Sequence, residues 1–134
     1  MDALAVILEG PERLALRQLE LRSPEASVVT AWSGSSSGTE NLFWTGKMPH
    51  FPGMVYPLGP GYESVGRIVD AGADAKARIG EWVFVPGANC YTRARGLFGG
   101  TAQRLVVSSA RALTVPEALG KDGVLCALAA TALH

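Results

Sequence analysis

Cysteine and histidine are both scarce in this chain of 134 residues. Cys90 and Cys126 lie far apart and form no C-x-x-C pattern, which excludes a disulfide framework and a structural zinc cluster. Neither has a histidine beside it in a motif, so we interpret both as inert small apolar side chains. His50 has no ligand partner at a recognisable spacing and is interpreted as a solvated loop residue. His134 is the terminal residue, which we expect to fray.

The chain also lacks an excess of charge and a long apolar run. Twelve Lys and Arg residues balance twelve Asp and Glu residues, with no run of like charges, so nucleic acid and anionic membrane are poor candidate partners. No segment approaches 18 uninterrupted apolar residues, which excludes a membrane span. The first apolar stretch, residues 3–8, is too short for a signal peptide and has no basic region before it. We therefore expect a cytoplasmic protein.

What the chain does contain is frequent punctuation: sixteen Gly and eight Pro separate short runs rich in Val, Ile and Leu. This pattern predicts a mainly β fold with one C-terminal helix. A phase slip near Arg17 and Gln18 predicts a β-bulge in the second strand. The expected strands cover residues 3–8, 14–21, 28–32, 64–70, 82–85, 103–107 and 112–115.

The end of the chain has a helical composition from Asp122 to His134. Its apolar residues form a stripe that is still apolar where the sequence stops, which suggests a truncated chain. An exposed stripe of this kind favours association, so a homo-oligomer is among the expected states.

Residues 61–72 read GYESVGRIVDAG and are followed by GEWV at 80–83. This block resembles the G-x-E-x-x-G-x-V-x-x-x-G motif of the medium-chain dehydrogenase/reductase superfamily. The resemblance implies a GroES-like, partly open β-barrel as the substrate and catalytic domain over residues 1–118. Residues 119–134 would then begin the helix that leads into a Rossmann domain, and that half is missing. No G-x-G-x-x-G follows a strand, so we expect no cofactor-binding residues and no NAD binding by this chain alone.

A closer resemblance rests on WSGSSSGTE at 32–40, WTGKMP at 44–49 and FPGM at 51–54. These strings are similar to the BchC family, the bacteriochlorophyllide a dehydrogenases. The resemblance implies that the full-length protein oxidises the 3-(1-hydroxyethyl) group of a bacteriochlorophyllide to 3-acetyl with NAD, in bacteriochlorophyll biosynthesis. A tetrapyrrole would then be the small-molecule substrate.

By the same resemblance, the catalytic zinc site has lost its ligands. Ser36 stands where a ligand Cys is expected, Tyr62 replaces the His of the usual G-H-E, and Ala127 aligns with a third ligand. Glu63 remains, but one hard carboxylate does not hold zinc. We therefore predict no metal ligands and no zinc.

Without a metal, a protein group must polarise the alcohol. Tyr62 can donate a hydrogen bond to the substrate oxygen or accept its proton, although a ring packed under a turn is the equal alternative. Thr39 aligns with the proton-relay Ser/Thr of the superfamily, with Glu40 as the acid beside it. Thr39 as the cap of the next segment and Glu63 as an acceptor for loop N–H groups remain alternatives.

The segment from Phe43 to Leu58 is rich in aromatic and methionine side chains. Such a loop can form the floor of a pocket for a flat tetrapyrrole by stacking and dispersion. We predict Trp44, Met48, Phe51 and Tyr56 as substrate-binding residues. A loop that packs into the core or against the Rossmann half is the alternative.

Two other functions remain open from the sequence. One is a fragment of a zinc-independent quinone or enoyl reductase, a class that also shows G-x-E in place of G-H-E. The other is a non-catalytic, freestanding GroES-like binding domain.

Overall fold

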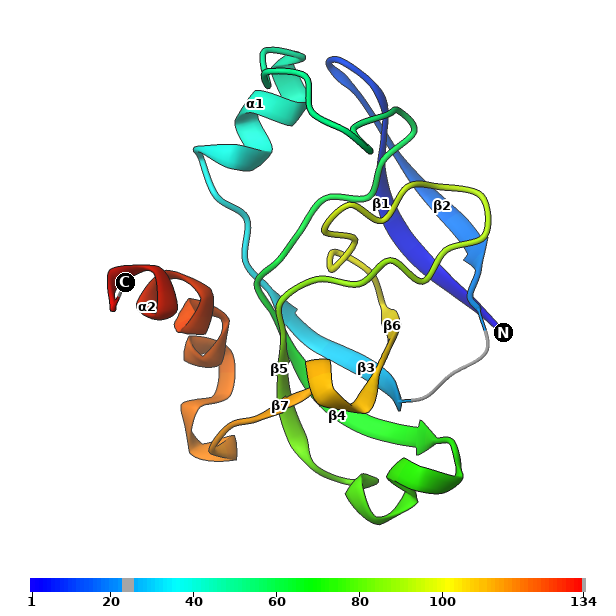
Figure 1. Cartoon of the computed structure of the whole chain (residues 1–134), viewed down its shortest axis with the longest axis vertical. Coiled ribbons are helices and arrows are strands. Elements are labelled where there is room, and N and C mark those ends of the chain that lie inside the picture. The colour runs from blue at the N-terminus through cyan, green and yellow to red at the C-terminus, as the bar shows by residue number, and fades with distance from the viewer. Residues whose placement is uncertain (23–25, 134) are drawn as a thin grey trace.

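The computed structural model describes residues 1–22 and 26–133, so the predicted fraying of His134 lies outside the described residues. Seven strands form a two-stranded and a five-stranded antiparallel arrangement (Figure 1). The hairpin consists of β1 (Asp2–Gly10) and β2 (Arg13–Glu20). The five-stranded sheet has the order β6-β3-β4-β5-β7. Its strands are β3 (Ala26–Ser33), β4 (Ser64–Ala71), β5 (Trp82–Val85), β6 (Arg104–Val107) and β7 (Leu113–Thr114).

The predicted mainly β fold with a C-terminal helix is confirmed, and each predicted strand has a counterpart. The predicted bulge near Arg17 and Gln18 is wrong, because both residues pair in regular register with β1. The irregularity lies instead between Leu8 and Gly10, beside the turn. The slip in the apolar pattern therefore reflects which β2 side chains are exposed: Leu14 and Leu16 both face solvent.

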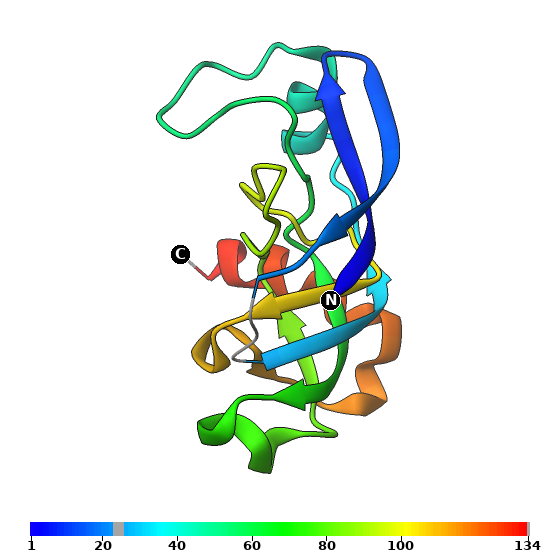
Figure 2. The ribbon, with the colours of Figure 1, turned by 90° about the vertical axis from the view of Figure 1, so that its right-hand side faces the viewer.

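One main core joins the hairpin to the sheet. Ile7 of β1, Ile68 of β4 and Leu105 of β6 are fully buried in the same cluster. Figure 2 shows the hairpin extending past the end of the sheet toward the short helix α1 (Thr39–Thr45). The hairpin and α1, which are distant in sequence, therefore lie near each other in the fold.

The sequence did not predict α1. The helix is only seven residues long and ends at Gly46, whose φ of 71° is the left-handed conformation typical of a helix C-terminus. Glu40 and Phe43, three positions apart, form its buried face. Because most of the stability of such a short helix comes from packing, the sequence pattern alone gave no signal.

The C-terminal region is more broken than the single helix predicted from Asp122 to His134. The 3-10 segment η3 (Glu117–Leu125) contains a non-helical residue, Gly120, and α2 begins only at Cys126 and ends at Ala132. No residue of α2 is buried, and Leu125 and Leu128 are about half exposed. Over the described residues, no helix is both long and apolar enough to cross a membrane.

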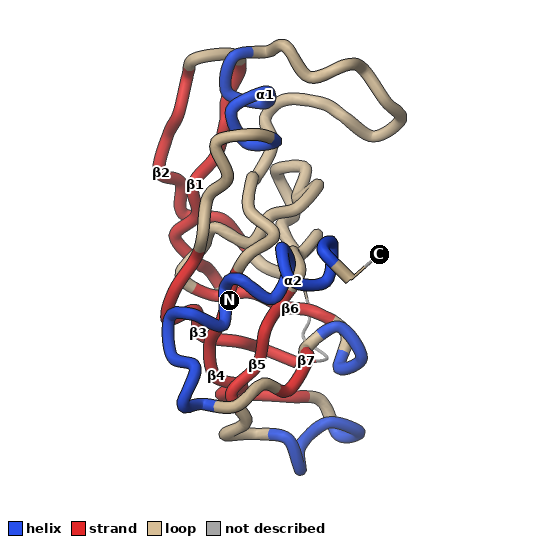
Figure 3. The backbone as a smooth tube through the Cα atoms, turned by 90° about the vertical axis from the view of Figure 1, so that its left-hand side faces the viewer, coloured by secondary structure: helices blue, strands red, loops and turns tan. Residues whose placement is uncertain are grey.

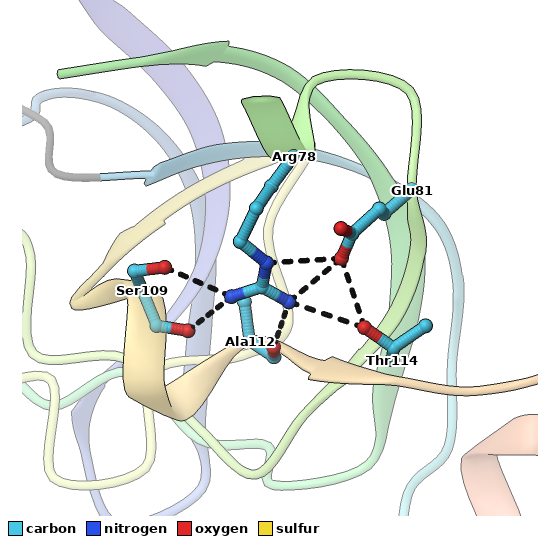
Figure 4. A network of polar contacts seen from close by, with 5 residues as sticks. All are labelled: Arg78, Glu81, Ser109, Ala112 and Thr114. Atoms are coloured by element: carbon cyan, nitrogen blue, oxygen red, sulfur yellow. Dashed lines mark hydrogen bonds and ion pairs between the residues drawn. The ribbon is translucent and has the colours of Figure 1, made fainter. Parts of the chain in front are cut away.

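The guanidinium of Arg78 links several segments near strand β7, at one edge of the sheet (Figure 4). Arg78, at the end of η1 (Ala73–Arg78), donates to Glu81 Oε2 at 2.8 and 2.9 Å and to the Ala112 carbonyl at 2.7 Å. It also donates to the Ser109 carbonyl, in the 3-10 segment η2 (Ser109–Arg111), at 2.5 Å. Since β7 has only two residues, these contacts hold the edge of the sheet where ladder bonds are few.

We expect Arg78→Met to lower the midpoint of thermal unfolding by on the order of 5 °C, because several charge-assisted hydrogen bonds are lost together. The contacts with Arg78 hold the pKa of Glu81 below its ordinary value, so their contribution is present above that value and is lost as the pH falls through the lowered pKa. The stability difference between parent and variant should therefore shrink in acid. Lys76→Met, exposed in the same segment, is the control; equal losses for both variants would contradict the role of Arg78.

Candidate functional site

The Gly-x-Glu turn that precedes β4 is fixed by a second glycine-rich loop. Gly61 has a φ of 102°, and a side chain there would collide with Thr101. The Gly100 amide donates to the Gly61 carbonyl at 2.8 Å, and Ser64 Oγ donates to the Gly100 carbonyl at 2.7 Å. The Gly-x-Glu turn and the loop at residues 99–101 therefore lie against each other. Figure 3 shows these long loops gathered between α1 and the sheet.

Glu63 is buried at the start of β4, with about 5% of its surface exposed. Its carbonyl accepts the Gly34 amide at 2.7 Å, and its carboxylate lies against the Cα of Gly34, where a side chain would collide with it. Oε1 of Glu63 is buried without a hydrogen-bond partner among the described residues. Glu63 therefore has one carboxylate oxygen that is not engaged within the described residues, and its catalytic role stays a prediction.

Glu40 is the second buried acid, with about 8% of its surface exposed. Its Oε2 accepts the Ser36 amide at 3.1 Å, while its Oε1 has no partner among the described residues. Burial raises the pKa of Glu40, and the nearby charge of Glu63 raises it further, against the lowering effect of backbone hydrogen bonds. The sequence presented Glu40 only as the acid beside Thr39, since its burial depends on the packing of α1.

Tyr62 and Thr39, the other predicted catalytic residues, are both half-buried. The Tyr62 ring packs edge-on against Phe98, with 5.2 Å between centroids, and within the described chain its hydroxyl has no hydrogen-bond partner. Thr39 is the first residue of α1, the N-cap is Gly38, and no side-chain cap hydrogen bond is present among the described residues, so the alternative that Thr39 caps this segment is wrong. Tyr62 therefore combines a packed ring with an uncommitted hydroxyl.

A pocket of about 420 Å³ lies beside α1, between the hairpin and the serine-rich loop. Glu40 and Trp44 line it from α1, and Ser36 lines it from the loop before the helix. Thr39, Tyr62 and Glu63, the predicted catalytic residues, do not line it. The sequence missed the remaining lining, which consists of Val6, Leu8, Leu14, Ser35, Ser37, Asn41, Pro60 and Thr101.

The aromatic segment after α1 divides between this pocket and a second apolar cluster. Trp44 faces the pocket, whereas Met48, Phe51 and Tyr56 pack around buried Phe43. The Tyr56 hydroxyl donates to the Phe43 carbonyl at 2.5 Å, and burial raises the pKa of Tyr56. These three side chains are half-buried, so part of each surface is still exposed. Their role in substrate binding stays a prediction.

The residues present do not suit the catalytic zinc ion of the superfamily. In the described part of the chain, no three His, Cys, Asp or Glu side chains gather in a way that could hold a metal. Cys90 is buried in the main core, and burial raises the pKa of its thiol. Zinc prefers nitrogen and sulfur ligands, whereas the acids and serines near α1 offer only oxygen.

Comparison with known proteins gives the site a context. The family model of the alcohol dehydrogenase GroES-like domain matches residues 24–117. Two curated relatives, from Rhodobacter capsulatus and Cereibacter sphaeroides, are each 49% identical over the whole chain. Both bear the name 2-desacetyl-2-hydroxyethyl bacteriochlorophyllide A dehydrogenase. The chain spans 44% and 45% of their respective lengths.

Solved structures agree on the fold. An Escherichia coli oxidoreductase of unknown specificity superposes with a TM-score of 0.78 at 19% identity, over 100% of this chain and 46% of its own. A short chain alcohol dehydrogenase from E. coli CFT073, complexed with NADH, gives 0.72 at 23% identity, over 92% of this chain and 42% of its own. A butanediol dehydrogenase from Bacillus subtilis gives 0.71 at 20%, over 92% of this chain and 43% of its own. The match in each case covers less than half of the larger protein.

Proposed function

Because the chain belongs to the alcohol dehydrogenase GroES-like domain family, we propose that it is the substrate-binding half of a bacteriochlorophyllide dehydrogenase. The observation that carries this proposal is the 49% identity, over the whole chain, to two hydroxyethyl bacteriochlorophyllide dehydrogenases. The full-length enzyme oxidises the 3-(1-hydroxyethyl) group to 3-acetyl. NAD is the hydride acceptor, which the NADH in one structural neighbour supports.

In this reaction the alcohol loses a hydride and a proton. The carbinol carbon loses a hydride to the nicotinamide, the hydroxyl loses a proton to a base, and the carbonyl forms. The uncommitted hydroxyl of Tyr62 polarises the substrate oxygen, and Thr39, the first residue of α1, assists. Half-buried Met48, Phe51 and Tyr56 offer apolar contact to the macrocycle.

We propose that this chemistry proceeds without zinc. Purified protein, dialysed against a mild chelator, is expected to contain far less than one zinc per chain, because Ser36 and Tyr62 are not zinc ligands of the usual kind and the described residues hold no group of His, Cys, Asp or Glu that could bind a metal. Elemental analysis measures this directly. About one zinc per chain would reverse the assignment and make Glu63 a candidate ligand.

The function is tested by incubating the full-length protein with NAD and tetrapyrroles that carry either a hydroxyethyl or a vinyl group. NADH should form, with a shift in pigment absorbance, only with the hydroxyethyl substrate. Activity on quinones or enoyl compounds instead would favour the reductase alternative. The 134-residue chain alone should show no NAD binding by calorimetry, since it lacks a Gly-rich turn opening a helix toward a pyrophosphate.

A further inference from the structure

Two buried acids pack against one short segment of backbone, residues 34–36. The Glu63 carboxylate lies against Gly34, and Glu40 Oε2 accepts the amide of Ser36, two residues further along. Both acids keep Oε1 buried and without a partner in the described part of the chain. An ionised carboxylate in this condition costs several kcal/mol of solvation, so a second one beside it is strongly opposed.

No positive group compensates the two acids within the described residues. The ion pairs found there are Arg17 with Glu9, Arg67 with Glu117, and Arg78 with Glu81. The charged group felt by Glu40 is Glu63, and it acts in the same direction as burial, raising the pKa of Glu40. A second carboxylate beside Glu40 therefore opposes its ionisation, as burial does.

We propose that Glu40 and Glu63 form a carboxyl pair that holds one proton at neutral pH, accepts the proton released by the substrate hydroxyl, and passes a proton to the pocket. The second part rests on the function proposed above. The alcohol O–H bond breaks as a carboxyl O–H bond forms, while the hydride goes to NAD and the carbonyl forms. Glu40 is the exit, since it lines the pocket beside Ser36 and Trp44.

Gly34 makes the close packing of Glu63 possible. A Cβ atom at this position would collide with the Glu63 carboxylate and would lie only 3.1 Å from Glu63 Cβ. Its lack of a side chain therefore leaves room for Glu63 to approach the segment that also holds Glu40.

The first test is infrared spectroscopy of the 134-residue chain with labelled glutamate. A protonated carboxyl band is expected at neutral pH in the parent, absent in Glu40→Gln and titrating at lower pH in Glu63→Gln. Glu117→Gln, an exposed acid on another face, should leave the band unchanged. No band in the parent, or a band that persists in Glu40→Gln, would overturn the pair. So would loss of the band on adding Ca²⁺ or Mg²⁺, which would identify a hard-cation site instead.

The second test uses the full-length enzyme and the hydroxyethyl pigment. Glu40→Gln should lower kcat by about 100-fold with little change in pigment affinity, the lower end of the range for proton-transfer groups. Glu63→Gln should move the acid limb of the pH profile to lower pH, because removing one negative charge lowers the pKa of Glu40.

The outcomes separate the two proposals. If the parent does not oxidise the pigment, the proposed function fails, while the parent's infrared band still decides whether the pair holds a proton. If the parent oxidises the pigment but both Gln variants keep its rate and pH profile, the proton-accepting role fails and the function stands. The parent band needs no variant, so a variant that does not fold leaves the first test intact.

Discussion

In the full-length enzyme, Tyr62→Phe should reduce turnover of the hydroxyethyl pigment by at least about tenfold, equivalent to roughly 1.4 kcal/mol of activation free energy. The substitution removes the oxygen that we propose polarises the alcohol and keeps the ring. Stability should change by less than about 1.5 kcal/mol, since the ring retains its edge-on contact with Phe98 and the hydroxyl has no partner within the described residues. Steady-state kinetics and thermal melts measure the two effects separately.

Tyr91→Phe is the matched control for this change. Tyr91 is about 1% exposed, and its hydroxyl donates to the Gly99 carbonyl at 2.5 Å. Removing that hydroxyl leaves a buried acceptor unpaired, so stability should fall while turnover below the melting range is preserved. If Tyr62→Phe keeps the turnover of the parent, Tyr62 is a packing residue and Thr39→Val becomes the next variant to assay.

Phe43→Ala should destabilise the chain by about 3–5 kcal/mol, a large share of the stability of a typical domain. Phe43 is fully buried, and its ring packs edge-on against Phe51 at 6.3 Å and Phe98 at 6.0 Å between centroids. The variant loses both aromatic contacts and leaves a cavity between α1 and the loops. Urea denaturation of the 134-residue chain measures the loss.

Two further variants show whether the loss comes from the Phe43 site. Leu42→Ala, the next residue on α1 but 37% exposed, should cost far less. Phe43→Leu should fall between the two, since it fills most of the volume but loses the edge-on contacts. Equal costs for the two alanine variants would show that the helix itself, and not the packing of its inner face, had been damaged.

The sequence by itself determined the strands and the Gly-x-Glu block. Runs of Val, Ile and Leu between glycines and prolines mark strands because both signals are local. The block can be recognised in the sequence because backbone geometry requires its glycines. Gly61 adopts a φ of 102°, and a side chain at Gly66 would collide with the Val29 carbonyl. These constraints act at the residue itself, so they are visible in its identity.

Only the tertiary structure decided what the site residues can do. Helix α1 packs through its buried residues Phe43 and Glu40, and the pocket is lined both by Leu14 of the hairpin and by Trp44 of α1. Neither contact has a local signature. Glu40 and Glu63, twenty-three positions apart, come near each other because both pack against residues 34–36. The raised pKa of Glu40 follows from its burial and from the charge of Glu63, and both depend on the packing of segments that are distant in sequence.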